Sequence, residues 1–285
     1  MMPRAAFSIC PALSAITHAP MSEPDKLFTG GAAYERLMGR WSRVVGEVFL
    51  DWVNAPKNLA WLDVGCGNGA FTEELIARCA PAAVTAIDPS DDQLAYARTR
   101  PGAKMTDFRV GDAQNLPFAD AAFDVAVMAL VIAFLPNPGR AVAEMARVVR
   151  PGGSVIAYMW APGGGVPVHP IHLALESMGL TSGGVPNPAA SERGAMQRFW
   201  EDAGLESIET REIRIPTIYS NFDDFWDSNV VPIGPQGKTI ASMSASAREE
   251  LRSRVCNQLP VSPDGRIIYH SSANSIKGRV PDNRT

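Results

Sequence analysis

Short apolar runs and amphipathic stretches alternate along the first half of the chain. Apolar runs of strand length occupy residues 59–65, 82–88, 122–134 and 154–161, and a shorter one lies within 105–118. Between them, residues 70–80, 89–100 and 138–150 repeat apolar positions at helical spacing. Strands that alternate with helices pair in parallel through right-handed connections. The pattern therefore predicts a doubly wound α/β sheet.

The segments on either side of this region have a different texture. Residues 32–53 place Leu37, Trp41 and Val45 at helical spacing, which predicts an amphipathic helix ahead of the first strand. After Trp160 the chain becomes rich in turn residues. We predict helices over 171–178, 191–205 and 244–259, an insert at 221–234, and strands over 206–215 and 265–278.

Charge and cysteine usage narrow the function classes. The formal net charge of -4 argues against a protein that works by gripping phosphate backbones, so we expect no nucleic-acid partner. The four cysteines show no C-x-x-C spacing, which favours reduced thiols over a zinc site or a disulfide framework. No apolar run reaches the roughly 18 to 20 residues that cross a bilayer. We therefore expect a soluble, cytoplasmic protein without a membrane span that acts on a small molecule.

The first twenty residues contain no acid and are rich in Ala, Ser and Pro. Targeting segments can have this composition, but prolines interrupt the apolar run and Met21 opens a polar stretch. We predict that residues 1–25 form a disordered extension, with a targeting segment or a misassigned start as the open alternatives. Residues 26–285 are expected to form a single domain.

The stretch WLDVGCGNGAF, residues 61–71, places a glycine-rich turn between the first predicted strand and the next helix. This is the geometry of dinucleotide-binding loops, and Gly65, Gly67 and Ala70 satisfy the loose G-x-G-x-x-G/A form. Asp63, however, stands two residues before Gly65. A fixed carboxylate disfavours a pyrophosphate and favours a cation. S-adenosylmethionine carries an ammonium and a sulfonium and no phosphate, so it suits this loop better.

With Gly69 the loop reads D-x-G-x-G-x-G, which resembles motif I of the class I S-adenosylmethionine-dependent methyltransferases. Asp88 closes the second strand, residues 111–124 (GDAQNLPFADAAFD) resemble the family's next signature, and ARVVRPGG precedes the fifth strand. The chain is most similar to the type 11 group, which includes enzymes of ubiquinone and menaquinone biosynthesis. The expected fold is a Rossmann-like, mostly parallel seven-stranded sheet with helices on both faces and an antiparallel last strand.

The resemblance implies S-adenosyl-L-methionine as cofactor and assigns residues to it. Asp88 would bind both ribose hydroxyls, Asp112 would accept from the adenine amino group, and the Ala113 amide would meet the ring. The implied cofactor-binding residues are Asp63, Gly65, Gly67, Asn68, Gly69, Thr72, Asp88, Asp112, Ala113, Leu130, Tyr34 and Arg40. Residues 32–54 would form a helical lid, 59–160 the cofactor-binding core, and 161–285 a substrate-side insert with the C-terminal strands.

Structural explanations compete with several of these assignments. Asp88 could simply cap the next helix, Asp112 could be a turn residue, and Thr72 could be an ordinary helix residue. Residues Tyr34, Met38 and Trp41 could be core rather than lid. The aromatic side chains in the insert, Phe222, Phe225 and Trp226, are expected to pack in the core rather than to line a pocket.

The methyl acceptor is not readable from the sequence, because transfer from an activated sulfonium depends mainly on positioning. A carbon, nitrogen, oxygen or sulfur acceptor stays open, as does the oligomeric state. An oxygen acceptor would call for a base, for which the candidates are His169, His172 and Tyr158. The two histidines have no matching acid or cysteine nearby, so no metal site is expected. A non-catalytic S-adenosylmethionine-fold protein and an NAD(P)-dependent oxidoreductase are the alternative functions.

Overall fold

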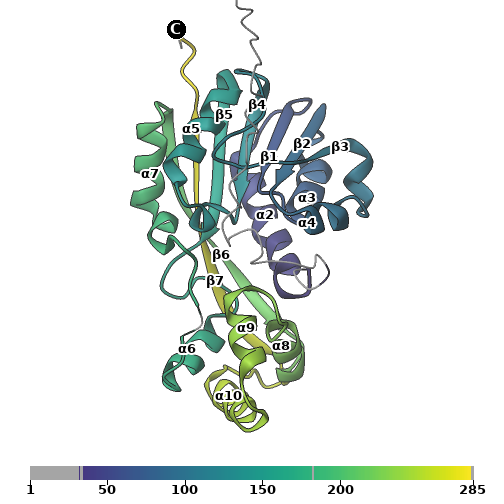
Figure 1. Ribbon diagram of the computed structural model, residues 1–285, viewed down its shortest axis with the longest axis vertical. Coiled ribbons are helices and arrows are strands. Elements are labelled where there is room, and N and C mark those ends of the chain that lie inside the picture. Colours follow the sequence, from purple (N-terminus) through teal and green to yellow (C-terminus); the bar gives the residue numbers. More distant parts are fainter. Residues whose placement is uncertain (1–31, 33–34, 182, 284–285) are drawn as a thin grey trace, which may run out of the picture.

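The computed structural model describes residues 32, 35–181 and 183–283 (Figure 1). Its strands form one seven-stranded sheet in the order β3-β2-β1-β4-β5-β7-β6. They are β1 (Ala60–Val64), β2 (Ala83–Asp88), β3 (Thr106–Val110), β4 (Phe123–Ala129), β5 (Val149–Trp160), β6 (Glu206–Tyr219) and β7 (Ile267–Arg279). All neighbours pair in parallel except β7, which is antiparallel to both β5 and β6. The predicted Rossmann-like sheet with its antiparallel last strand is confirmed.

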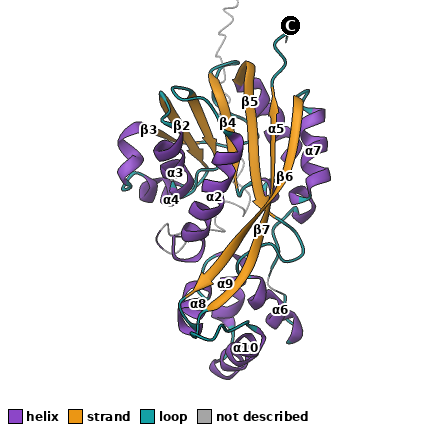
Figure 2. Cartoon of the chain, turned by 180° about the vertical axis from the view of Figure 1, so that it is seen from behind, coloured by secondary structure: helices purple, strands orange, loops and turns teal. Residues whose placement is uncertain are grey.

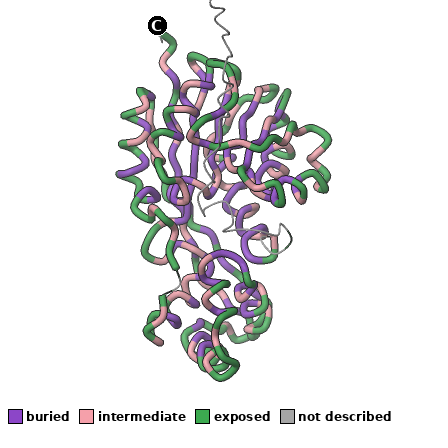
Figure 3. The backbone as a smooth tube through the Cα atoms, viewed as in Figure 1, coloured by how far each residue is buried: buried purple, intermediate pink, exposed green. Residues whose placement is uncertain are grey.

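The strand order reverses at β1, which pairs with β2 on one side and β4 on the other. Right-handed connections then place the helices that lead from β1 to β3 on one face and the helix between β4 and β5 on the opposite face. The first set is α3 (Ala70–Cys79) and α4 (Asp91–Ala97), with α2 (Arg40–Val53) packed against α3; the second is α5 (Pro138–Val148), with α7 (Arg193–Asp202) beside it. Figure 3 shows the buried residues concentrated along the strands between these layers.

Several boundaries differ from the predicted ones. The fourth strand was expected to run to Phe134, but β4 ends at Ala129. Leu130 takes a left-handed conformation with φ 62°, and its amide donates to the carbonyl of Tyr158 on β5 at 2.8 Å. A short 3-10 helix, Ile132–Phe134, follows. The apolar run therefore continues past the strand because its last residues pack against neighbouring elements, not because they extend the sheet.

The remaining boundaries shift by smaller amounts. Helix α4 is shorter than the predicted 89–100 segment, and a 3-10 turn, Pro101–Met105, follows it. Strand β5 begins at Val149, ahead of the glycines that were expected to precede it. Ahead of α2, the expected lid helix begins with a π-helical turn, Glu35–Gly39.

Strands β6 and β7 continue beyond the end of β5 and form a two-stranded arm (Figure 2). The pairing of β5 with β7 stops at Trp160 and Ala273, whereas β6 and β7 stay paired as far as Tyr219 and Ile267. A group of helices gathers around the end of the arm, which we call the cap (Figure 1). It consists of α6 (His169–Ser177), α8 (Phe222–Asn229), α9 (Gly234–Ser242) and α10 (Ala245–Gln258). Across the described part of the chain, none of the helices is long and apolar enough to cross a membrane.

Trp200 attaches helix α7 to the sheet. Its side chain is fully buried, and its Nε1 atom donates to the carbonyl of Val155 on β5 at 2.9 Å. The strand beside it carries Gly278, where a Cβ atom would lie 2.7 Å from the Trp200 ring. The indole therefore fills a space that a glycine on β7 leaves open.

We predict that Trp200→Ala lowers the free energy of unfolding by about 3 to 5 kcal/mol, because it empties this space. Trp200→Phe keeps most of the apolar volume and loses the hydrogen bond, so it should cost about 1 to 2 kcal/mol. Urea denaturation followed by circular dichroism measures both. A loss below about 1 kcal/mol for the alanine variant would contradict the anchoring role.

Candidate functional site

The glycine-rich loop follows β1 and leads into α3. Gly65, Gly67 and Gly69 all have positive φ angles, of 76°, 52° and 77°. At Gly65 a Cβ atom would also lie 2.5 Å from a methyl carbon of Val131. A side chain at this position would therefore be strained by its backbone and would collide with the segment that follows β4.

The backbone N–H groups of this loop bond to the protein itself. Gly65 and Cys66 donate to the Ile87 carbonyl, Gly67 donates to Asp88 Oδ2 at 2.8 Å, Gly69 donates to the Cys66 carbonyl, and Ala70 donates to Asn68 Oδ1 at 3.2 Å. In a dinucleotide-binding loop such groups face the pyrophosphate. Here five of them already have internal acceptors.

Asp88 stands at the carboxyl end of β2, where it holds the loop and faces the cavity described below. Its Oδ2 atom accepts from Gly67, and its Oδ1 atom accepts from the amide of Ser90 at 2.9 Å. The cap of helix α4 is Ser90, whose hydroxyl accepts from the Gln93 amide. The alternative that Asp88 only caps this helix is therefore wrong.

Asp63 lies behind the loop, away from the cavity. It is fully buried, and its Oδ2 atom accepts from the hydroxyl of Thr72 at 2.6 Å. Its Oδ1 atom accepts no hydrogen bond from the described residues. Burial raises the pKa of Asp63 to about 7; the Thr72 bond opposes this rise and the charge of Asp88 adds to it. Asp63 and Thr72 thus brace the first turn of α3 against β1.

One cavity of about 810 Å³ runs from the glycine loop to the cap. The expected site residues that line it are Gly65, Gly67, Asn68, Asp88, Asp112, Ala113, Leu130, Tyr158, His169 and His172. The expected residues Asp63, Gly69, Thr72 and Arg40 do not line it, and Tyr34 lies outside the described residues. Contacts at the glycine loop and contacts at the cap therefore belong to the same continuous space.

Asp112 and Ala113 border the cavity beyond the end of β3. Asp112 accepts from the Gln114 amide at 2.9 Å, so it is a turn residue as well as a lining residue. Ala113 is buried. Sequence reasoning missed Gln93, a buried polar residue of α4 that also lines the cavity. A glutamine on the inward side of a predicted helix was the signal that could have found it.

Arg40 joins helix α2 to the arm and the cap. Its guanidinium lies over the rings of Trp41 and Tyr219, at 4.5 and 4.6 Å from their centres, and it pairs with Asp224 at 3.6 Å. The indole Nε1 of Trp41 donates to the hydroxyl of Tyr219 at 3.2 Å. Helix α2 is therefore fixed against β6, while Leu37, Met38 and Ser42 of the same segment line the cavity.

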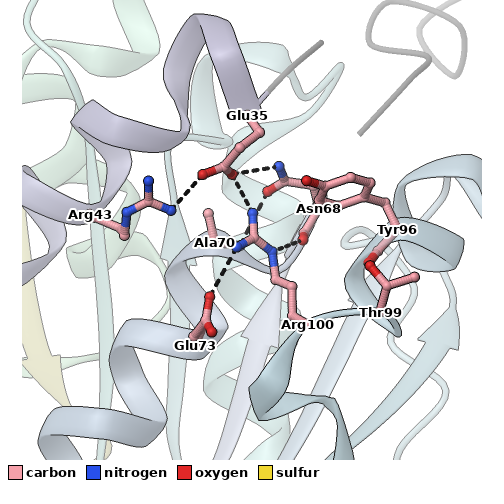
Figure 4. A network of polar contacts seen from close by, with 8 residues as sticks. All are labelled: Glu35, Arg43, Asn68, Ala70, Glu73, Tyr96, Thr99 and Arg100. Carbon is pink, nitrogen blue, oxygen red and sulfur yellow. Dashed lines mark hydrogen bonds and ion pairs between the residues drawn. The ribbon is translucent and has the colours of Figure 1, made fainter. Parts of the chain in front are cut away.

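Arg100 fastens the start of this N-terminal segment to the glycine loop (Figure 4). Its Nε atom donates to the carbonyl of Asn68 at 2.6 Å, and its guanidinium pairs with Glu73 at 2.9 Å and with Glu35. The Asn68 amide donates to Glu35 at 3.1 Å. Burial alone would raise the pKa of Glu35, but Arg43 and Arg100 lower it overall. The carboxylate of Glu35 thus stays charged between two arginines and the loop.

The three candidate bases lie at different places along the cavity. Tyr158, on β5, packs between Phe49 and Phe71, with ring centres 4.8 and 5.7 Å away. His169 and His172 lie on α6 with ring centres 6.5 Å apart. Burial lowers the pKa of His172; the charge of His169 adds to this effect, whereas Gln236 and Glu176 oppose it. His172 is therefore a neutral imidazole at pH 7.

The aromatic residues of the insert pack against one another and against the arm. The aromatic residues Phe222, Phe225 and Trp226 stack on one another and none of them lines the cavity. Phe225 also packs edge-on against Tyr219, which places it at the far end of the arm. No group of three or more histidine, cysteine, aspartate or glutamate side chains that could hold a metal gathers among the residues described.

Known proteins share both the core segment and the fold. Residues 62–157 match the family described as "Methyltransferase domain". A malonyl-[acyl-carrier protein] O-methyltransferase from Pectobacterium atrosepticum is 40% identical over 116 residues, 41% of this chain and 44% of that one. A ubiquinone/menaquinone biosynthesis C-methyltransferase from Dinoroseobacter shibae is 33% identical over 124 residues, 42% and 50% of the two chains. The chain thus spans about half or less of the length of these relatives.

Solved structures extend the likeness to most of the fold. The YcgJ protein of Bacillus subtilis has a TM-score of 0.56 at 18% identity, covering 84% of this chain and 98% of that one. A phosphoethanolamine N-methyltransferase of Haemonchus contortus has a TM-score of 0.53 at 18% identity, covering 87% and 56%. The class is therefore a Rossmann-like protein of methyltransferase fold. Residues 62–157, which carry the motifs quoted above, are the part that matches the methyltransferase-domain family.

The buried carboxyl of Asp63 gives a pH-dependent stability. Its pKa is about 7 in the folded chain against a usual 3.8, so the folded state holds an extra proton between these values. Stability from this group is present at low pH and is lost as pH rises through 7. We predict that the free energy of unfolding of Asp63→Asn, relative to that of the wild type, is at least about 1 kcal/mol higher at pH 8 than at pH 5. Chemical denaturation at both pH values measures this, with Asp92→Asn as an exposed control. If the difference in free energy of unfolding between Asp63→Asn and the wild type is the same at both pH values, the prediction is wrong.

The Arg100 contacts generate a second prediction. Arg100→Met removes the partner of Glu35 that lies outside the N-terminal segment and leaves only Arg43 of α2, so this segment should open more often. Hydrogen exchange of amides 35–42 should rise about 10-fold or more, the equivalent of one lost charged hydrogen bond. Arg98→Met is the matched control, because Arg98 is nearby and, among the described residues, donates to the Phe108 carbonyl rather than to Glu35. Unchanged exchange in 35–42 would show that Arg100 does not hold this segment.

Proposed function

We propose that this chain is an S-adenosyl-L-methionine-dependent methyltransferase that acts on a small-molecule acceptor. The matched methyltransferase domain and relatives named as O- and C-methyltransferases support this. In this proposal residues 59–160 hold the cofactor, residues 32–54 form a lid over it, and residues 161–285 supply the acceptor side. The free thiols of Cys66, Cys79 and Cys256 are compatible with a cytoplasmic protein.

The glycine loop carries the choice of cofactor. Five of its N–H groups already have acceptors inside the protein, and one of these acceptors is the Asp88 carboxylate. No lysine or arginine among the described residues lines the cavity. A pyrophosphate placed here would face carboxylates rather than free N–H donors, which disfavours NAD(P). S-adenosylmethionine has a net positive charge and brings no phosphate, so this arrangement favours it.

The residues at this end can contact each part of such a cofactor. The carboxylate of Asp88 borders the cavity, and its two oxygens are the kind of paired acceptor that would suit the two ribose hydroxyls. Asp112 and Ala113 line the cavity where the adenine would extend. Gly65, Gly67, Asn68 and Leu130 would contact the remainder. Asp63 and Thr72 would act from behind, by holding the loop in place.

The bound cofactor would supply an activated methyl group, and the chain would contribute position and shelter. Helix α2 and the cap enclose the cavity from two sides, and apolar side chains dominate its wall. An acceptor held between them is oriented and kept from water, which are the main contributions that methyl transfer requires. In this proposal, an acceptor that is already nucleophilic would need no residue of the site to act as a base.

We predict that the purified chain binds S-adenosylmethionine and that Asp88→Ala weakens binding by about 2 kcal/mol, roughly 30-fold, because a charged acceptor of two hydroxyls is lost. The affinity of Asp88→Asn should lie between those of the wild type and Asp88→Ala, since its amide retains one acceptor oxygen. Asp91→Ala is the control, because Asp91 is exposed on the next helix. Isothermal calorimetry gives the affinities. Equal affinity in Asp88→Ala would overturn the ribose assignment.

Two further measurements separate the alternative functions. S-adenosylmethionine should raise the melting temperature of the chain, and NAD(P) should leave it unchanged. A rise with NAD(P) and none with S-adenosylmethionine would favour an oxidoreductase. A turnover assay with labelled methyl donor against a metabolite extract should transfer label to a small molecule. Cofactor binding without any transfer would favour the non-catalytic alternative.

A further inference from the structure

The end of the cavity at the cap has an apolar wall with a small polar group set into it. Val166, Val168 and Ile233 belong to the wall. The polar members come from three cap helices: His169, His172 and Glu176 on α6, Asn229 at the end of α8, and Gln236 on α9. We call this part the acceptor end. Its polar groups are few and localised, which is the usual composition of a site that orients one functional group of a ligand.

The charges along the cavity have one sign. The ionisable acids that line it are Asp88, Asp112 and Glu176, and no arginine or lysine of the described residues joins them. An isolated carboxylate or phosphate taken from water into this space would lack a cationic partner, which costs several kcal/mol. The carboxylate of S-adenosylmethionine differs, because its own ammonium lies on the same carbon. An anionic acceptor has no such internal partner.

Gln236 presents an acceptor atom to this space. The residue is only 8% exposed. Its Nε2 atom donates to the carbonyl of Asn229 at 3.0 Å, and this bond fixes which end of the amide is nitrogen. The remaining atom, Oε1, is buried; the amide interacts with His172, but Oε1 accepts no hydrogen bond of good geometry from His172 or any other described residue. Leaving a buried amide oxygen without a donor is costly, so its presence points to a donor supplied by a ligand.

His172 provides a second acceptor close to Gln236. The two side chains interact, and burial keeps the imidazole neutral at pH 7 by lowering its pKa. His169 and Glu176, the other titratable groups on this helix that face it, act in opposite directions. A neutral imidazole offers one nitrogen as acceptor. Two uncharged acceptors thus lie together, and neither is a cation that could pair with an anion.

The amide of Gln236 is held by a rigid support. Asn229, which receives its Nε2 bond, donates to the Tyr219 hydroxyl at 3.1 Å and to the Phe225 carbonyl at 2.7 Å. Tyr219 in turn accepts from Trp41 of helix α2. Each of these side chains is buried. The Oε1 atom is therefore fixed in direction rather than free to turn away from a ligand.

We propose that the acceptor end takes an uncharged molecule with an apolar body and a hydroxyl group that donates to Gln236, with His172 as the neighbouring acceptor, and that it rejects carboxylate and phosphate acceptors of similar size. This inference rests on the proposed function, because the acceptor must share the cavity with the cofactor. It deepens that function by naming the class of acceptor that these side chains recognise.

Three probes of one size test the proposal on the full-length chain loaded with S-adenosylhomocysteine at pH 7.5. 2-Naphthol has the hydroxyl donor, 2-methoxynaphthalene has the same rings without the donor, and 2-naphthoate replaces it with an anion. Calorimetry should show 2-naphthol binding about 10-fold or more tightly than either of the others, the equivalent of one hydrogen bond to a buried acceptor. Equal or tighter binding of 2-naphthoate, or of 2-methoxynaphthalene, overturns the proposal, as does an absence of 2-naphthol binding.

Variants at Gln236 locate the effect. Gln236→Leu should weaken 2-naphthol about 10-fold and leave 2-methoxynaphthalene unchanged. Gln236→Lys places a cation in the acceptor end and should reverse the preference in favour of 2-naphthoate. His270→Gln is the matched control, because His270 is exposed on β7 and does not line the cavity. A 2-naphthol affinity that is indifferent to both Gln236 variants contradicts the assignment of this residue.

Binding of S-adenosylhomocysteine is measured in each protein before the probes are added. If the wild-type chain binds it and the probe preferences fail, the acceptor class is wrong while the proposed function stands. If the wild-type chain does not bind it, the proposed function itself fails. Should a Gln236 variant not fold, as judged by its melting curve, the comparison of the three probes on the wild-type chain still decides the proposal.

Discussion

The hydrogen bond from the Gly67 amide to the Asp88 carboxylate is the contact on which the cavity depends. Strands β1 and β2 pair in parallel, with Val64 beside Ile87, so their carboxyl ends meet at one edge of the sheet. This brings the loop after β1 against the acid that ends β2. The bond holds the glycine turn, consumes an N–H group that could attract a phosphate, and leaves a carboxylate facing the cavity. The same bond thus fixes the shape of the loop and places a negative charge beside the cavity.

The two acids of this region have different roles, although the sequence presents them as a pair. Asp63 was expected to supply the charge that favours a cationic ligand. It is instead buried behind the loop against Thr72 and does not line the cavity, and its pKa is raised to about 7. Asp88, which is bonded to backbone N–H groups and faces the cavity, is the acid that the proposed cofactor would meet. In the proposed function, a preference for a cation would therefore come from the end of β2 rather than from the end of β1.

Features set by local sequence were predictable, and features set by tertiary contacts were not. The first strands and α3 follow from apolar runs that glycine and proline interrupt, and the loop motif placed Asp88 beside its glycines. The end of β4 was mispredicted because the left-handed turn at Leu130 depends on its bond to Tyr158. The acceptor end was missed for a related reason. Gln236 lies between the predicted insert at 221–234 and the predicted helix at 244–259, where no element was expected, and its proposed role rests on its position beside His172 and its bond to Asn229.

The contacts that fix the acceptor end also fix helix α2, whose residue Ser42 lines the cavity. Trp41 donates to Tyr219, Tyr219 accepts from Asn229, and the carbonyl of Asn229 holds the Gln236 amide. This chain of buried bonds runs from helix α2 through the arm to the cap. A displacement of α2 would remove a donor from Tyr219, and the cost would extend to the groups that orient Gln236. The position of α2 beside the cavity and the orientation of the Gln236 amide are therefore coupled, because both depend on one set of bonds around Tyr219.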